Sequence, residues 1–193
     1  MKKILLVIIG LAIFAGVAIS QEDKKEVLVP ALLVIDVQNK YLPMMSQDDQ
    51  ESALEMMNWA IYLFRHYDLP IIRVYHTSKE WGPEPGTEEF QFPESLNVEE
   101  SDPMIIKTYG SAFNKTELDS LLKDKGVNTL YLCGLSSVGC VLATYFDAGN
   151  YDYNKFLIKD ALLGPDAAYT NKIEEMFDAI SLNTANFMLQ FAE

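Results

Sequence analysis

The chain has 193 residues, 49% of them hydrophobic, which is enough for one ordinary domain to bury a continuous core without disulfides or metals. Its formal net charge of −13 argues against nucleic acid or an anionic membrane surface as a partner, because both are bound through basic patches. Two cysteines, Cys133 and Cys140, are too few for the disulfide framework of a small secreted domain.

The first residues differ in pattern from the rest of the chain. Two lysines precede an apolar run over residues 4–19, and small residues then lead to Ser20 and a polar stretch. This order predicts a signal peptide at residues 1–20, cleaved after Ser20, with export to the periplasm or the extracellular space and membrane contact only through this segment. An uncleaved anchor is the alternative, but the run is shorter than the roughly 20 apolar residues of a spanning helix. Residues 27–193 are then predicted to be a single domain.

Apolar strand-like runs alternate along this domain with amphipathic stretches at helical spacing. Strands are predicted at residues 31–36, 69–75, 104–106, 128–133 and 155–158, with a further strand expected around 187–189, and helices at 48–66, from 114 onward, at 138–148 and at 169–180. This alternation predicts a three-layer, Rossmann-like α/β fold on a mainly parallel sheet. The irregular, proline-containing insertion at 77–102 is long enough to suggest a lid or a binding loop.

Three chemically capable side chains follow predicted strands. Asp36 ends the first strand, Lys107 ends the third, and Cys140 lies just past the fourth. Because the carboxyl ends of parallel strands meet at one edge of the sheet, the three are expected there together. Each also has a purely structural interpretation: aspartate caps turns, a lysine leaving a strand is normally solvated, and a free cysteine is often a small buried hydrophobe.

The turn at residues 134–140 favours a chemical role for Cys140. It is built of small residues that let the backbone approach a ligand, and a helix is predicted to follow. A thiol at a helix N-terminus near a lysine is expected to have a pKa below the usual value of about 8.5. Backbone N–H groups of the same turn suit a developing oxyanion, as acyl transfer requires. Cys133, inside the strand, fits the buried hydrophobe better.

Other motifs fail at this turn. A P-loop would need a lysine where Cys140 stands, and a serine nucleophile elbow would need Gly-x-Ser-x-Gly. Two isolated histidines, His66 and His76, make neither a catalytic triad nor a zinc site, so no metal or cofactor is predicted. The base must then be a carboxylate, and Asp36 is the one that the fold brings to this edge.

Three ordered blocks carry a resemblance to a known family. They are residues 33–39 (LVIDVQN), 107–113 (KTYGSAF) with 116–118 (TEL), and 140–148 (CVLATYFDA). Together they resemble the signature blocks of the isochorismatase-like cysteine hydrolases, which include nicotinamidases, N-carbamoylsarcosine amidohydrolases and ureidoacrylate amidohydrolases. The match extends from about residue 30 to residue 165.

The resemblance implies a six-stranded parallel sheet, a catalytic triad of Asp36, Lys107 and Cys140, and a non-proline cis peptide at Leu135-Ser136. It also implies cleavage of a C–N bond in a small amide or carbamoyl-type substrate through a Cys140 thioester, with the N–H groups of Ser136 and Cys140 holding the oxyanion. Family members often assemble, so a homo-oligomer is consistent with it. The presence of Cys140 favours amide chemistry over vinyl ether hydrolysis.

The chain also departs from family patterns. Nicotinamidases carry a metal-binding aspartate and histidine cluster after the second strand, where this chain offers only His76. Tyr41, Trp81 and Tyr109 are candidates to line an aromatic substrate pocket, although aromatic side chains are more often packing residues. Two other functions stay open: a catalytically silent small-molecule-binding protein, and a redox protein in which Cys133 and Cys140 form a couple.

Overall fold

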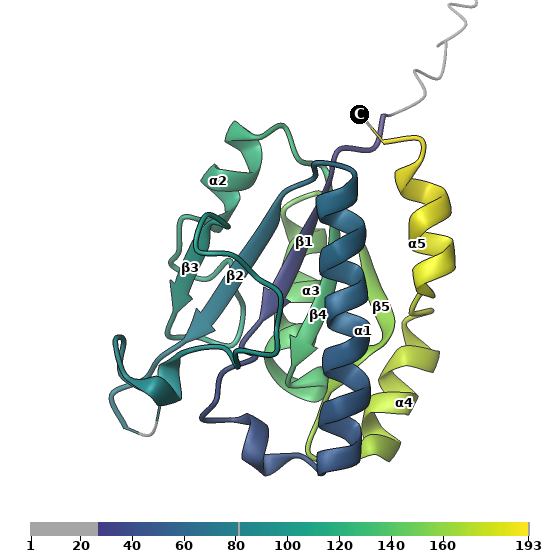
Figure 1. Cartoon of the computed structure of the whole chain (residues 1–193). Coiled ribbons are helices and arrows are strands. Elements are labelled where there is room, and N and C mark those ends of the chain that lie inside the picture. The colour runs from purple at the N-terminus through teal and green to yellow at the C-terminus, as the bar shows by residue number, and fades with distance from the viewer. Residues whose placement is uncertain (1–26, 81, 193) are drawn as a thin grey trace, which may run out of the picture.

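The computed structural model describes residues 27–80 and 82–192 (Figure 1). The predicted signal peptide at 1–20 and the pocket candidate Trp81 lie outside these residues. Five strands form one sheet in which every neighbouring pair is parallel, in the order β3-β2-β1-β4-β5. The strands are β1 (Pro30–Ile35), β2 (Ile71–His76), β3 (Met104–Lys107), β4 (Thr129–Leu135) and β5 (Asn154–Leu163).

Helices cover both faces of this sheet and make the three expected layers. They are α1 (Gln47–His66), α2 (Leu118–Asp124), α3 (Leu142–Asn150), α4 (Ala167–Met176) and α5 (Leu182–Leu189), with short turns η1 (Leu42–Met44), η2 (Glu88–Phe90) and η3 (Ser137–Val141). α1 and α5 pack on one face, and α2 and α3 pack on the other (Figure 1). None of the helices in the described part of the chain has the length and apolar character needed to cross a membrane.

Burial explains why the central strands read as continuous apolar runs. All six residues of β1 and all seven of β4 are buried, since helices cover both faces of the sheet there. Successive side chains point to opposite faces, so Cys133 joins the core under α1 while Leu132 joins the core under α2 and α3. The edge strand β3 instead alternates between exposed and buried positions.

The expected sixth strand is not formed, and the prediction of a strand at 187–189 is wrong. These residues belong to α5, whose first turn is capped by the Ser181 side chain, which accepts from the Thr184 N–H. Among the described residues, β5 is paired on that side by a single parallel bridge between Ile158 and Ile180. The N-cap of α5 follows Ile180 directly and ends any further strand pairing. A run of three apolar residues is too short to show the periodicity that would distinguish a helix from a strand.

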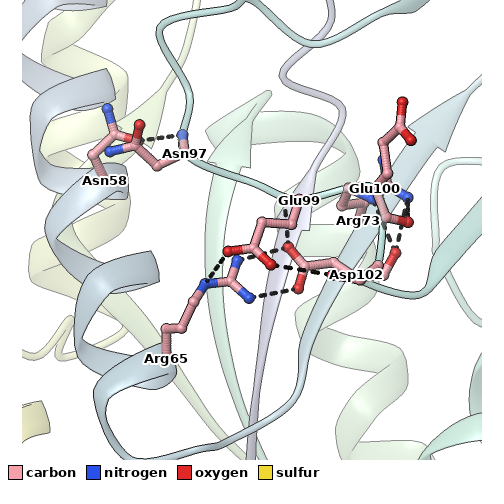
Figure 2. Close-up of polar contacts among 8 residues, drawn as sticks. Asn58, Arg65, Arg73, Asn97, Glu99, Glu100 and Asp102 are labelled. Carbon is pink, nitrogen blue, oxygen red and sulfur yellow. Dashed lines mark hydrogen bonds and ion pairs between the residues drawn. The ribbon is translucent and has the colours of Figure 1, made fainter.

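The insertion between β2 and β3 is tied to α1 and β2 by polar contacts (Figure 2). The Arg65 guanidinium on α1 donates to both carboxylate oxygens of Asp102 at 2.9 Å and lies 3.4 Å from Glu99. Two turns earlier on the same helix face, the Asn58 amide accepts from the Asn97 N–H at 2.8 Å and donates to the Ser95 carbonyl at 2.7 Å.

Aromatic packing anchors the same insertion from inside. The rings of Phe90 and Phe92 stack on Tyr75 of β2, with centroids 4.9 and 4.2 Å away. All three side chains are buried in the core under α1. These contacts make Phe90 and Phe92 of the insertion part of the folded body, while a role of the segment as a lid or a binding loop stays a prediction.

Candidate active site

A buried ion pair joins the ends of β1 and β3. The Lys107 ammonium donates to Asp36 Oδ2 at 2.6 Å and to the Tyr109 carbonyl at 3.2 Å. Asp36 and Lys107 are 2% and 1% exposed, so neither charge is solvated and each depends on the other. The register of the parallel strands brings the Asp36 and Lys107 side chains together: His76 of β2 lies opposite Lys107 of β3, and Val74 of β2 lies opposite Ile35, the residue before Asp36.

The Cys140 thiol completes the group from the turn after β4. It lies in η3, within interaction range of both the Asp36 carboxyl and the Lys107 ammonium. Asp36 Oδ1 is buried and has no well-formed hydrogen bond to any described residue. Because Lys107 holds the other oxygen, Oδ1 is the atom that can take a proton from the thiol. The three residues that the sequence singled out are thus brought together.

The backbone around this group adopts unusual conformations. Asp36 has a φ of 54°, in the left-handed region, which costs of order 1–3 kcal/mol for a non-glycine residue and is typical of functional sites. Gly134 has a φ of 115°, and a Cβ there would lie 2.1 Å from the Ile35 carbonyl oxygen. The peptide bond between Leu135 and Ser136 is cis, at the position that the family resemblance implied.

Burial is the main influence on the protonation of the Asp36 carboxyl and the Cys140 thiol. Burial raises the pKa of Asp36 from 3.8 to about 6, an effect that the neighbouring Lys107 partly offsets. Burial, together with the adjacent Asp36 carboxylate, raises the pKa of Cys140 to about 11. At neutral pH the proton therefore rests on the thiol, and the base beside it is ionised.

The expectation of a Cys140 pKa below 8.5 is consequently wrong. It assumed that a regular helix would begin at this residue, whereas α3 begins at Leu142 and Gly139 has non-helical backbone angles of −125° and −107°. The thiol also lies against a carboxylate in a desolvated turn, and both effects favour the neutral form.

A pocket of about 410 Å³ opens onto this group, within the size range of small-molecule sites. Both residues proposed to supply oxyanion N–H groups, Ser136 and Cys140, line it, and so does the predicted contact Tyr41. The complete lining is Asp36, Tyr41, Met44, Met45, His76, Gly110, Leu135, Ser136, Cys140 and Pro165.

His76 is a pocket residue that the sequence had appeared to rule out of the chemistry. Its Nδ1 is 2.8 Å from the Tyr41 hydroxyl, and burial together with Lys107 lowers its pKa to about 4, so the ring is neutral at pH 7. Burial also raises the pKa of Tyr41, which stays protonated. The signal that could have identified His76 is its place at the carboxyl end of β2. No three His, Cys, Asp or Glu side chains cluster closely enough to hold a metal ion anywhere in the described ranges.

Gln38 is a second residue that sequence reasoning missed. Its buried amide donates to the carbonyls of His76 and Phe90 at 3.0 Å, and its carbonyl oxygen accepts from the His76 N–H at 2.8 Å. These bonds join the loop that carries Asp36 and Tyr41 to the end of β2 and to the insertion. A glutamine after a strand has no distinctive local pattern, so only its tertiary partners reveal this role.

The ring of Tyr109 does not reach the pocket. It is 41% exposed, and its hydroxyl accepts from Lys115 Nζ at 2.9 Å on the surface. Only the backbone carbonyl of Tyr109 takes part in the site, through Lys107. The prediction of a pocket-lining Tyr109 side chain is therefore wrong, because the chain turns outward after β3.

The two cysteines do not form a redox pair in this structure. Both thiols are free, and Cys133 is buried in the core under α1, donating to the Leu33 carbonyl at 3.6 Å. Cys140 instead packs against the core on the opposite face of the sheet. Burial raises the pKa of the Cys133 thiol, which fits a structural residue rather than a reactive one.

The chain is an α/β protein with a parallel sheet, and a buried carboxylate and ammonium and a partly buried thiol meet at the carboxyl edge of that sheet. The model of the isochorismatase domain matches residues 30–186. The chain therefore belongs to the isochorismatase family.

Individual relatives agree with this assignment. The chain is 31% identical over 139 residues to the uncharacterized isochorismatase family protein YddQ of Bacillus subtilis (strain 168), covering 69% of this chain and 77% of that protein. It is 31% identical over 83 residues to the ureidoacrylate amidohydrolase RutB of Agrobacterium fabrum, covering 42% of this chain and 36% of that protein.

Solved structures share the fold. A crystal structure of an isochorismatase family protein is 27% identical with a TM-score of 0.71, covering 81% of this chain and 99% of that one. The N-carbamoylsarcosine amidase of Thermoplasma acidophilum superposes with a TM-score of 0.69 at 23% identity, covering 80% and 95% of the two chains. The second likeness concerns the fold alone.

Proposed function

We propose that this protein hydrolyses the C–N bond of a small amide or carbamoyl-type substrate through a thioester on Cys140. The observation that carries the proposal is that Asp36 and Cys140 interact at the wall of one pocket, with the Lys107 ammonium bound to the same carboxylate. The amidohydrolase activity named for the relative RutB supports the reaction class.

In the proposed first half-reaction, the thiol proton passes to Asp36 Oδ1 while sulfur attacks the substrate carbonyl carbon. The carbonyl electrons move to oxygen, and the N–H groups of Ser136 and Cys140 donate to the resulting oxyanion. When the tetrahedral intermediate collapses, Asp36 returns the proton to nitrogen and the amine or ammonia leaves. Lys107 keeps Asp36 ionised by partly offsetting the effect of burial on its pKa.

In the second half-reaction, water attacks the thioester with Asp36 as the base. The carboxylic acid leaves, and the thiol regains its proton. Because Asp36 must be ionised in the free enzyme and burial raises its pKa to about 6, kcat/KM is expected to rise between pH 5 and 7. This base-coupled attack needs no resting thiolate, so the raised pKa of Cys140 is compatible with it.

The test is direct detection of the acyl-enzyme. The protein is mixed with a panel of amides and carbamoyl compounds, quenched in acid and digested, and the peptide that contains Cys140 is weighed by mass spectrometry. We expect a mass increase equal to the acyl group, lost in Cys140→Ala together with turnover. Cys133→Ala, the matched removal of the other thiol, is expected to keep the adduct.

Turnover that survives in a folded Cys140→Ala variant would contradict the mechanism. Binding of the panel without any adduct or turnover would instead favour the catalytically silent binding protein. We further propose that the protein works after export, as the sequence of residues 1–20 predicts.

A further inference from the structure

The pocket at the proposed active site has mostly apolar walls. Beside the reacting group stand Tyr41, Met45 and Leu135, which are 6%, 9% and 4% exposed, and Pro165. Met44 lies at the rim, where it is 58% exposed and still lines the pocket. Apolar and thioether side chains bind uncharged groups well and provide no hydrogen bonds to a charged one.

The charges at the pocket are already paired. Asp36 is the one charged side chain among the described lining residues, and the Lys107 ammonium is bound to that carboxylate and to the Tyr109 carbonyl. His76 is held neutral, and its Nδ1 faces the Tyr41 hydroxyl. A substrate carboxylate would enter beside the Asp36 carboxylate without the arginine or lysine partner that such groups need when they are desolvated.

We propose that the acyl group of the substrate is uncharged and apolar, so that the site selects amides with a neutral acyl group, such as simple primary amides, against amides that carry a carboxylate. This inference rests on the proposed amide hydrolysis and specifies its substrate class. The reaction is R–CONH₂ + H₂O → R–COOH + NH₃: the C–N bond breaks, a C–O bond forms, and no electrons are exchanged with another reactant.

The same arrangement favours release of the product. Hydrolysis creates a carboxylic acid that ionises at neutral pH, inside a pocket that holds Asp36 and apolar walls. The negative charge is absent from the substrate and present in the product, so the Asp36 carboxylate repels the product alone. We expect the product carboxylate to inhibit only at concentrations well above the KM of its amide.

Matched substrate pairs test the inference in the full-length protein. Butyramide is compared with succinamate, and benzamide with 4-carbamoylbenzoate, because each pair differs only by a carboxylate far from the amide. We expect kcat/KM for the neutral member to exceed that for the acid by about 100-fold or more at pH 7.5. Equal or better turnover of the acids, with an adduct on Cys140, would overturn this inference and leave the proposed function intact.

A charge change at the rim provides a second test. Met44→Arg supplies the missing cation at an exposed position, and Met44→Gln is the neutral control of similar size. We expect Met44→Arg to move the ratio of the two kcat/KM values toward the acid by about tenfold or more relative to Met44→Gln. An unchanged ratio would contradict the pocket argument. Failure of every neutral and acidic amide to acylate Cys140 would remove the proposed function and this inference with it.

Discussion

Asp36 and Lys107 form a single buried pair that matters for stability and for the proposed chemistry. Each charge is almost fully desolvated, and their contact at 2.6 Å is what makes either ion tolerable there. Lys107 lowers the pKa of Asp36, but burial raises it by more, so the pKa of the carboxyl still rises to about 6. A base with a pKa near the working pH is well suited to accept and return a proton.

Lys107→Met is predicted to raise the pKa of Asp36 above about 6 and to move the acid limb of the pH–rate profile to higher pH, because burial then acts without the lysine. Removing one partner of a buried pair should lower the free energy of unfolding by about 3–5 kcal/mol at pH 7. The folded state would bind the Asp36 proton more tightly than the unfolded state does. The loss should therefore be small near pH 4 and grow as the pH rises.

Urea denaturation at several pH values measures this change. Lys123→Met is the matched control, because it removes a lysine from an exposed i,i+4 pair with Asp119 and should cost less than about 1 kcal/mol. A pH-independent loss in Lys107→Met would show that Asp36 does not carry the charge that the ion pair requires.

At the scale of elements, the close approach of β1 and β4 brings the Asp36 carboxylate near the turn that carries Cys140. Ile35 of β1 pairs with Gly134 of β4. After β1, Asp36 has a left-handed backbone conformation, and after β4, the turn that leads to Cys140 also departs from regular backbone geometry. A glycine is needed at 134 because its φ is positive and no space exists for a Cβ. Strand pairing thus determines where the base meets the thiol.

Gly134→Ala is predicted to lower the free energy of unfolding by about 3 kcal/mol or more and to reduce activity, since the new methyl group would push Ile35 and the adjacent Asp36 away. Gly126→Ala is the matched control: its φ is also positive, at 69°, but nothing lies within 4 Å of its Cβ position. That variant should lose only about 1 kcal/mol and keep its activity. Equal losses in chemical denaturation would refute the steric explanation.

On the scale of the whole molecule, the acidic surface and the predicted leader concern where the protein works. A net charge of −13 favours solubility and disfavours non-specific binding to nucleic acid. Intact mass of the protein recovered from a secretion-competent host is predicted to start at Gln21. Ala18→Trp, which replaces a small residue before the cleavage position, should leave the leader attached. A native protein that retains Met1 would contradict cleavage after Ser20 and favour the uncleaved anchor.

The whole sheet also illustrates how far sequence patterns extend. Apolar runs located every observed strand, and helical spacing located α1, α3 and α4 to within a few residues, because these signals are local and periodic. Asp36, Lys107 and Cys140 could be chosen from sequence because parallel strands bring their carboxyl ends to one edge. The sixth strand failed because a short apolar run fits a capped helix as well as a strand.

By itself, then, the sequence determined the α/β class, the family blocks and the three residues that meet at the site, since all of these are written in local order and spacing. Tertiary structure alone decided that Cys140 holds its proton, that His76 and Gln38 belong to the site, and that the Tyr109 ring does not. The physical reason is that desolvation and hydrogen bonding depend on neighbours far away in the chain, which a linear pattern does not specify.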